Sequence, residues 1–458
     1  MAAARAGRMG VDLTTGSIPK TLLKYAMPII LTNIVQQMYS LVDLMVIGHF
    51  LGSVGTVGVS TGGEMSDLVT PIAQSLATAG QIYIAQLAGA RMEEKIRRSA
   101  GTLVSLMLLA AVLFMAIGMG FCIPILRLMN CPEDALSQAE VYMMITCCGF
   151  PFIFAYNAVC GITRGLGESK RPLEFVIVAA TVNIFLDILF VAGFGWGVAG
   201  TAIATMASQV GAFAAAFRFL YKRREQFEFE LRPSWFRLDA EAAKIILRLG
   251  IPQAGRATAV HFSMMWVNAG INAYGLVASA TNGVGNKVQK FLNIWVISVT
   301  QAAGAVVGQN LGAGKQDRAE KTVWWTFITT FSAACVLTVI SFLIPRQVFG
   351  IFTEDPAVLD FGVTFMHIIV LHYFASAFTA SFQSIVTGAG FASMDFFIGI
   401  LDGIVCRIGL SILFAYVLGM GAVGFFWAMG LTRVIPGIIV FVYFISGSWK
   451  KRRLLTEG

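Results

Sequence analysis

Twelve long apolar runs constrain what this chain can fold into more than any other feature of its sequence. Each run has at least about 18 predominantly apolar residues, the length that a helix needs to cross the hydrocarbon core of a bilayer. The chain is 57% hydrophobic and 13% charged, whereas about 25% of residues are charged in a soluble domain. We therefore expect an all-α polytopic membrane protein with twelve transmembrane helices. The runs fall near residues 20–49, 54–87, 97–125, 135–163, 172–194, 196–221, 244–273, 277–310, 319–344, 356–387, 396–419 and 422–447.

The basic residues gather on one side of this twelve-span arrangement. The N-terminal arm, the central connection, three other connections and the C-terminal tail hold 26 of the 33 Lys and Arg residues, among them Arg5, Arg8 and Arg232. Arg127 and Arg346 lie in the opposite loops. The positive-inside rule then places both termini in the cytoplasm of a multi-pass protein of the cell membrane. This topology accounts for the net charge of +8 without a nucleic-acid partner. The first run is too long for a signal peptide and has no small-residue cleavage site, so we expect it to remain as a span.

The two halves of the chain repeat each other at an offset of about 223 residues. Gly52 matches Gly275, and Pro28 matches Pro252 at an offset of 224. The polar segment 222–243 separates the halves, so we expect an N-lobe at 1–221, a cytoplasmic linker at 222–243 and a C-lobe at 244–458. Six spans is an even number, so both lobes enter the membrane in the same direction. This predicts pseudo-two-fold symmetry along the membrane normal, a plan that secondary transporters use. Further matches join Gln86, Gly89 and Ala90 to Gln309, Gly312 and Ala313, and Gly165 and Gly167 to Gly388 and Gly390.

A GxGxxG sequence begins at Gly195 in the first half and at Gly419 in the second. Neither opens a βαβ unit, which a nucleotide-binding loop of this kind requires. We interpret both as tight turns between membrane helices.

Asp43 lies inside the first apolar run, where an ionised carboxylate costs at least ~2.5 kcal/mol, so it is a functional candidate. Asp187 lies in the fifth run, with Asn183 four residues earlier on the same helix face. Thr205 in the sixth run can add a hydroxyl group. Such an all-oxygen set suits a hard cation, and two buried carboxylates could instead hold a proton, so the choice between Na⁺ and H⁺ stays open. If Na⁺ is the ion, these four residues are its ligands.

The second half has no equivalent acids. At the repeat offset Asp43 matches Trp266 or Val267, and Asp187 matches Leu410. The function of the acids therefore belongs to the first half. The alternative is that each acid merely pairs with a neighbouring base, for instance Lys24 or Arg433.

Other polar residues in the runs have two open interpretations each. Glu64 and Asp67 share a face of the second helix and either line a cation path or lie in a wet vestibule. Pro28 removes one hydrogen bond from the first helix and makes either a bending point or a static kink. For the bases Arg256, Lys287, Lys290 and Arg407 of the second half, pairing with Asp402 or snorkelling is favoured over substrate binding.

Motifs for enzymatic chemistry are missing from the sequence. The four histidines form neither HExxH nor a close pair, and no GxSxG, Walker A or kinase signature occurs. The seven cysteines are odd in number and lie mostly in apolar runs, so we interpret them as packing residues rather than as disulfides or metal ligands. We expect neither an enzyme nor an ATP-driven pump, and no cofactor beyond a coupling ion.

The chain resembles the multidrug and toxic compound extrusion (MATE) family over nearly its whole length. The resemblance implies two six-helix lobes around a V-shaped cavity and antiport of organic cations against Na⁺ or H⁺. The motifs that support it are VDLMVIGHFLG at 42–52, QIYIAQLAGA at 81–90, RGLGESKRP at 164–172, NIFLDILF at 183–190, RLGIPQA at 248–254 and GQNLGAGKQDRAEK at 308–321.

Within this family the chain is similar to the DinF-like branch. That branch places its ion site in the N-lobe at the positions that Asp43, Asn183, Asp187 and Thr205 occupy here. Gln36, Tyr39 and Pro28 match polar and hinge positions of the first helix in that branch. The NorM-like branch relies on acids in the seventh and tenth helices. The corresponding stretches here, RATAVHFSMM and ASAFTASFQS, contain no acid.

We therefore predict a secondary antiporter that works by alternating access, as a monomer in membrane lipid, with organic cations as its small-molecule partners. Gln36, Tyr39, Glu64 and Asp67 are candidates for its substrate cavity. The alternative is a flippase for a lipid or a polyprenyl-linked precursor. A flippase would need a strongly cationic cavity for anionic head groups, whereas the first half is acidic.

Overall fold

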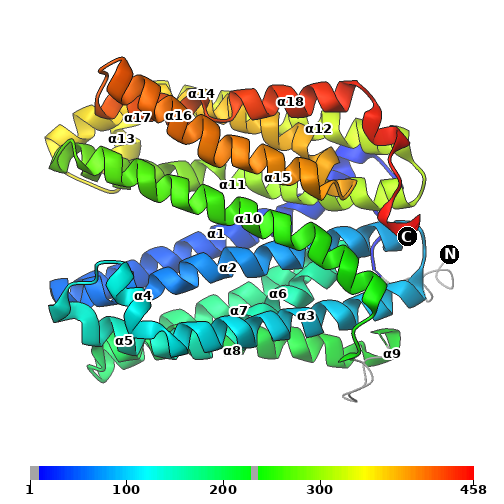
Figure 1. Ribbon diagram of the computed structural model, residues 1–458, viewed down its shortest axis with the longest axis horizontal. Coiled ribbons are helices and arrows are strands. Elements are labelled where there is room, and N and C mark those ends of the chain that lie inside the picture. The colour runs from blue at the N-terminus through cyan, green and yellow to red at the C-terminus, as the bar shows by residue number, and fades with distance from the viewer. Residues whose placement is uncertain (1–9, 228–235, 458) are drawn as a thin grey trace. The chain divides into compact units, whose positions relative to one another are not determined.

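The computed structural model describes residues 10–227 and 236–457, and every secondary-structure element in these ranges is helical (Figure 1). The predicted all-α class is confirmed. Arg5, Arg8 and Arg232, which contribute to the predicted charge asymmetry, lie outside the described residues, as does part of the predicted linker at 222–243.

The first half of the chain forms the predicted helices as follows. α5 and α6 meet at Gly149 with a bend of 43°, and α7 continues into a π-helix, η2. The elements are α1 (Ile18–Phe50), α2 (Gly52–Gly89), α3 (Glu93–Gly120), α4 (Cys122–Leu128), α5 (Glu133–Cys148), α6 (Phe150–Gly165), α7 (Lys170–Asp187), η2 (Ile188–Gly193), α8 (Gly197–Lys222) and α9 (Arg224–Phe227).

The second half repeats this order, with one span made of alternating α- and π-helical segments from Ala392 to Val417. The elements are α10 (Ala240–Asn272), α11 (Leu276–Gly312), α12 (Gln316–Leu343), α13 (Pro345–Gly350), α14 (Pro356–Gly388), α15 (Ala392–Ile400), η4 (Leu401–Cys406), α16 (Arg407–Ser411), η5 (Ile412–Val417), α17 (Ala422–Leu431), α18 (Val434–Ile445), and the short 3-10 segments η6 (Ser448–Lys451) and η7 (Leu455–Glu457).

The helices account for the twelve predicted spans. Among the described residues, nine helical segments are long and apolar enough to cross a membrane, and the bent α5–α6 pair makes a tenth. α2 and α10, with 38 and 33 residues, have the length of a span but lie outside this apolar set. The polar residues of α2 line a polar cavity, and α10 contributes Asn268 to a second cavity.

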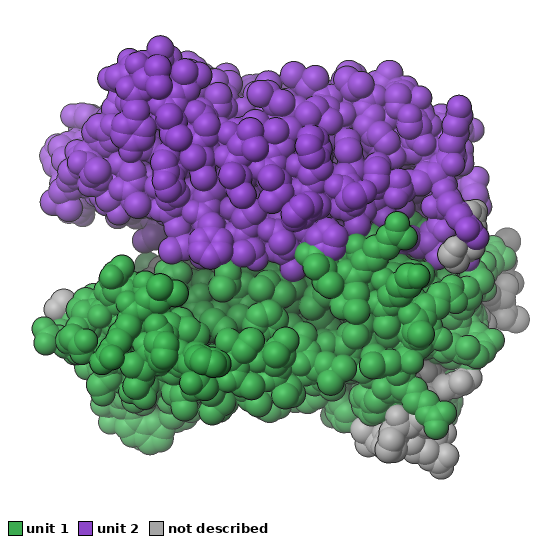
Figure 2. Space-filling model, viewed as in Figure 1, with its two compact units in different colours: residues 1–12, 31–251 green, residues 13–30, 252–458 purple. Residues whose placement is uncertain are grey.

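Contacts between Cα atoms divide the chain into two compact units (Figure 2). The first unit holds Leu31–Ile251 and the described residues up to Asp12, and the second holds Leu13–Ile30 and Pro252–Gly458. The lobe limits at 221 and 244 stay predictions. The sequence did not predict that Leu13–Ile30 groups with the second half.

The start of α1 joins the second unit through apolar packing on α11. Leu22, Tyr25 and Ala26 are buried in one hydrophobic cluster with Val299 and Ala302. Burying side chains of this size contributes about 1.5–3 kcal/mol for each large one. The first part of α1 is therefore held by partners that lie far away in the sequence.

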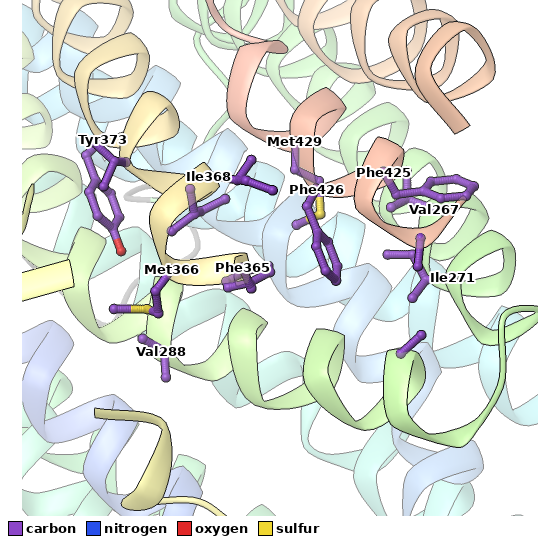
Figure 3. Packing of buried hydrophobic residues seen from close by; sticks show 14 of the residues in the cluster. Val267, Ile271, Val288, Phe365, Met366, Ile368, Tyr373, Phe425, Phe426 and Met429 are labelled. Carbon is purple, nitrogen blue, oxygen red and sulfur yellow. The ribbon is translucent and has the colours of Figure 1, made fainter. Parts of the chain in front are cut away.

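In the second unit α14 is the central helix and packs against α11, α12, α17 and α18. Figure 3 shows Phe365, Met366 and Ile368 of α14 beside Phe426 and Met429 of α17. The rings of Phe365 and Phe426 meet edge to face with their centroids 5.0 Å apart, a favoured geometry for aromatic pairs. This aromatic packing gives the second unit a hydrophobic core of its own.

The repeat is visible in the backbone at matched turns. Gly195 and Gly419 both have φ of +67°, and two residues later Gly197 and Gly421 have φ of +56° and +60°. These left-handed conformations favour glycine because it has no Cβ. Both GxGxxG sequences are confirmed as turns between helices, one before α8 and one before α17.

One π-helical segment has no counterpart. η2 at residues 188–193 matches η5 at 412–417, but η4 at 401–406 matches a regular stretch of α7. A π-helical turn inserts one residue into a helix, which explains why the repeat offset is 223 at Gly167 and Gly390 but 224 at Gly195 and Gly419. After η4, Asp187 therefore matches Ser411, and the predicted match with Leu410 is wrong by one residue.

Gly161 of α6 should be sensitive to enlargement. A Cβ at this position would lie 2.5 Å from the carbonyl oxygen of Ala77 in α2, and overpacking of this kind costs about 1–3 kcal/mol. We expect Gly161→Ala to lower the midpoint of thermal unfolding of the detergent-purified protein, measured by size-exclusion chromatography after heating. Gly283→Ala is the matched control, because nothing lies within 4 Å of a Cβ there. Equal midpoints for the two variants would contradict the close approach of α2 and α6.

Candidate functional site

The first unit contains a polar cavity of about 630 Å³ between α1, α2, α5, α6 and α8. One face of α2 supplies much of its wall, with Thr56, Ser60, Gly63, Asp67 and Gln74 at helical spacing. Residues three or four apart share a face of a helix, so this pattern turns the polar side of α2 inward. The cavity thus explains why α2 is less apolar than its neighbours.

Asp43 of α1 and Asp187 of α7 lie side by side next to this cavity. Their carboxyl groups are close enough to repel each other when both are ionised. Asp187 is only 1% exposed, and Asp43 is half-buried. Two ionised carboxylates have only acceptor atoms, so their contact requires a proton or another cation between them.

Asn183 lies on the same face of α7 as Asp187 and interacts with its carboxyl group, as the spacing of four residues predicts. Among the described residues, no hydrogen-bond partner is found for Oδ1 of Asp43, either oxygen of Asp187 or Oδ1 of Asn183, and all four atoms are buried. Buried polar atoms without partners are rare and call for an explanation. Four such oxygens in one place form a donor set that a hard cation prefers.

Thr205 of α8 lines the cavity and lies within hydrogen-bonding reach of the Tyr142 hydroxyl group. Tyr142 also interacts electrostatically with Asp43, Asp67 and Asp187. The tyrosine therefore connects the hydroxyl of Thr205 to the carboxylates. Sequence reasoning missed Tyr142, because nothing in its apolar run distinguishes it from Tyr156.

The predicted cavity residues are partly gathered here. Tyr39, Glu64 and Asp67 line the cavity, and Tyr39 interacts with Asp43. Gln36 lies about one turn earlier on α1 and is outside the set of described residues that line the cavity, so its assignment stays a prediction. Pro28 is buried within α1, which continues as one helix across it.

Within the described part of the chain, no group of three or more His, Cys, Asp or Glu side chains is arranged to hold a metal ion. The oxygens at Asp43 and Asp187 come from two carboxylates, an amide and hydroxyl groups. Such a set fits a monovalent cation or a shared proton better than a transition metal, which favours imidazole or thiolate ligands.

The two buried acids of the second half, Asp395 and Asp402, are paired with bases. Asp402 lies 3.7 Å from Arg407 and 3.5 Å from Arg433, so Arg407 has the partner that the sequence predicts. Arg256 instead pairs with Asp395 at 3.8 Å. Arg433, considered as a partner for the acids of the first half, forms its ion pair with Asp402.

Comparisons with known proteins match this chain over nearly its whole length. A family model described as MatE matches residues 28–189 and 254–417, one match in each half of the chain. The chain is 26% identical to the probable multidrug resistance protein YpnP of Bacillus subtilis, over 97% of this chain and 99% of the relative. It is 24% identical to the probable multidrug resistance protein NorM of Thermotoga maritima, over 96% and 95%. A solved structure described as an outward-facing multidrug resistance MATE family transporter matches with a TM-score of 0.88 at 22% identity, over 97% and 99%.

The contact between Asp43 and Asp187 predicts a charge-dependent stability. In Na⁺-free buffer at alkaline pH, we expect Asp187→Asn to raise the midpoint of thermal unfolding by about 2 °C, because it removes one of two like charges held together. At acidic pH, where protons neutralise both groups, the difference should disappear. Asp134→Asn, at an exposed position of α5, is the control and should not stabilise the protein. An Asp187→Asn midpoint at or below the wild-type value at alkaline pH would contradict the contact.

Proposed function

The chain belongs to the MatE family of multidrug efflux transporters, which are not enzymes, and we propose that it is a secondary antiporter that exports organic cations in exchange for H⁺ or Na⁺. The observation that supports this most directly is the contact between Asp43 and Asp187, with four buried oxygens that have no hydrogen-bond partner among the described residues. We further propose that it acts as a monomer in the cell membrane, with both termini in the cytoplasm.

The coupling step is competition for the same negative charge. With H⁺ or Na⁺ between Asp43 and Asp187, the like charges are compensated and the cavity has little attraction for a second cation. When the ion leaves, the two carboxylates and the nearby Asp67 attract a lipophilic cation into the cavity, where apolar walls accept its body. Exchange follows because a single cluster of acids serves both cations.

α1 could transmit this change of charge. The helix holds Asp43 near its end and Pro28 in its first half. Proline removes one hydrogen bond of the helix ladder, which lowers the cost of bending there. We propose that ion binding at Asp43 changes the bend at Pro28, and that the cavity opens to opposite sides of the membrane in turn.

The acidic character of the first cavity supports an antiporter over the flippase alternative. Asp43, Glu64 and Asp67 all line this cavity. An anionic lipid head group would meet like charge there and would also lose its hydration. An organic cation gains attraction from the same groups.

Removal of the Asp43 charge should abolish coupled export. In cells that express the full chain, we expect Asp43→Asn to reduce ethidium efflux at least about tenfold, since one charge-assisted interaction at a buried site is worth about 1.5–3 kcal/mol. Asp134→Asn should export at the wild-type rate. Separately imposed Na⁺ and pH gradients across everted vesicles identify the coupling ion. Equal efflux by wild type and Asp43→Asn would reject the role of Asp43, and wild-type failure to move any organic cation would favour the flippase.

The proposed bending point gives a separate test. We expect Pro28→Ala to slow efflux several-fold, because a restored helix hydrogen bond resists bending, while the alkaline destabilisation caused by Asp43 and Asp187 persists. Pro252→Ala is the matched control, because Pro252 occupies the repeat-equivalent place in α10. The same loss of efflux in both variants would mean that neither proline is specific to the ion-coupled movement.

A further inference from the structure

The second unit contains its own cavity of about 160 Å³ between α10, α11, α14, α16 and α17, with a mainly apolar wall that carries several polar and basic groups. Its charged lining residues are Lys290, Arg407 and Arg433. The amides of Asn286 and Asn293 also face it, and apolar side chains such as Met264 and Ile297 complete the wall. This wall is basic and partly apolar, in contrast to the acidic cavity of the first unit.

The repeat relates the two cavities. At an offset of 224, Asp43 matches Val267 and Thr205 matches Met429, and both matched residues line the second cavity. Asn183 also matches a residue of the second cavity, Arg407. The offset is again 224 here, because the extra residue of η4 comes before Arg407 in the chain. The same place in the repeated fold therefore holds acids and their partners in the first unit and an arginine in the second.

The positive charge of this second cavity exceeds its nearby negative charge. Three basic side chains line it, and Asp402 lies beside two of them, at 3.7 Å from Arg407 and 3.5 Å from Arg433. Asp402 also accepts a hydrogen bond from the Thr432 hydroxyl group at 3.3 Å. One carboxylate cannot balance three cations, and of the three only Arg407 is buried, where an uncompensated charge is costly.

Several polar atoms at the second cavity are buried and have no hydrogen-bond partner within the described part of the chain. They include Nε of Arg407 and Oδ1 of Asn293, whereas Nε of Arg433 lies 3.5 Å from Asp402. Arg407 and Asn293 are only 6% and 7% exposed. The donors of a guanidinium group match a carboxylate. The NH₂ group of Asn293 contacts Nε2 of His372 at 3.3 Å, so the donor at this cavity without a partner among the described residues belongs to Arg407.

The local backbone is also unusual at this place. Asp402 lies in η4, and Arg407 follows directly after it. In the first unit the matching stretch of α7 is a regular α-helix. π-helical turns occur frequently at functional sites, where they reposition side chains, and here the extra residue sets the register of Arg407.

We propose that this second cavity binds the carboxylate of a small organic acid, with Arg407 and Lys290 as its charge partners and the apolar wall in contact with the body of the ligand. A substrate that has both a cationic and a carboxylate group could use this cavity for its anionic end. The site lies wholly in the second unit and does not depend on ion coupling at Asp43.

Benzoate is a suitable probe, because it combines a carboxylate with an apolar ring, and benzamide is its uncharged match in shape. We expect saturable benzoate binding to the full-length protein in nanodiscs by isothermal titration calorimetry, with benzamide at least about tenfold weaker. Asp43→Asn should bind benzoate as wild type does, which separates this result from the fate of the antiport proposal. Equal binding of benzoate and benzamide, or no saturable binding of benzoate, would overturn the inference.

Two variants locate the binding. We expect Arg407→Met to weaken benzoate binding at least about tenfold and Lys290→Gln about threefold, because Lys290 is exposed and more screened by solvent. Lys287→Gln is the control, since Lys287 is exposed on the same helix but outside the described lining of the cavity. If Arg407→Met does not fold, the benzoate affinities of Lys290→Gln and Lys287→Gln still test whether the ligand binds in this cavity. The same affinity in these two lysine variants would overturn the assignment.

Discussion

Two acidic side chains in contact inside a membrane helix bundle cannot both stay ionised without a cation between them. The contact of Asp43 with Asp187 places this constraint at the centre of the first unit. In water the repulsion would be weak, but it grows as the surroundings become less polarisable. The same repulsion that makes the empty pair unfavourable makes it a good acceptor for a small ion or for a charged substrate. Antiport needs such a group, whose free energy depends strongly on whether a cation is bound.

Polar residues on membrane helices are concentrated where they face a cavity. α2 and α10 are long enough to span a bilayer but are less apolar than the other spans. The polar residues of α2 line the first cavity, and Asn268 of α10 lines the second. A helix that must contact water or ligand on one face cannot be apolar all round. The polar face of α2 thus marks the first cavity, whereas α10 contributes one polar residue, Asn268, to the second.

The sequence predicted the helices and most of the candidate residues at the first cavity, since depth in an apolar run identifies Asp43 and a spacing of four residues joins Asn183 to Asp187. It also predicted Tyr39, Glu64, Asp67 and Thr205, which line the cavity. It could not identify Tyr142, because which helices become neighbours is decided by packing across the fold. For the same reason it did not place Leu13–Ile30 with the second unit, where apolar contacts with α11 hold it. The change of repeat offset from 223 to 224 was visible in the sequence, but its cause was not, because a one-residue π-helical insertion such as η4 leaves no composition signal.

The repeat gives a physical reason for two cavities of opposite charge. Duplication of a six-helix unit produces two equivalent hollows, and each must compensate any charge that it buries. In the first unit, acids accumulate, and in the proposed mechanism a mobile cation compensates their charge. In the second unit, Arg407 replaces the amide of Asn183, and Asp402 supplies only part of the compensation through its pairs with Arg407 and Arg433. The remaining positive charge favours an anion, so the same fold offers attraction to both ends of a zwitterionic molecule.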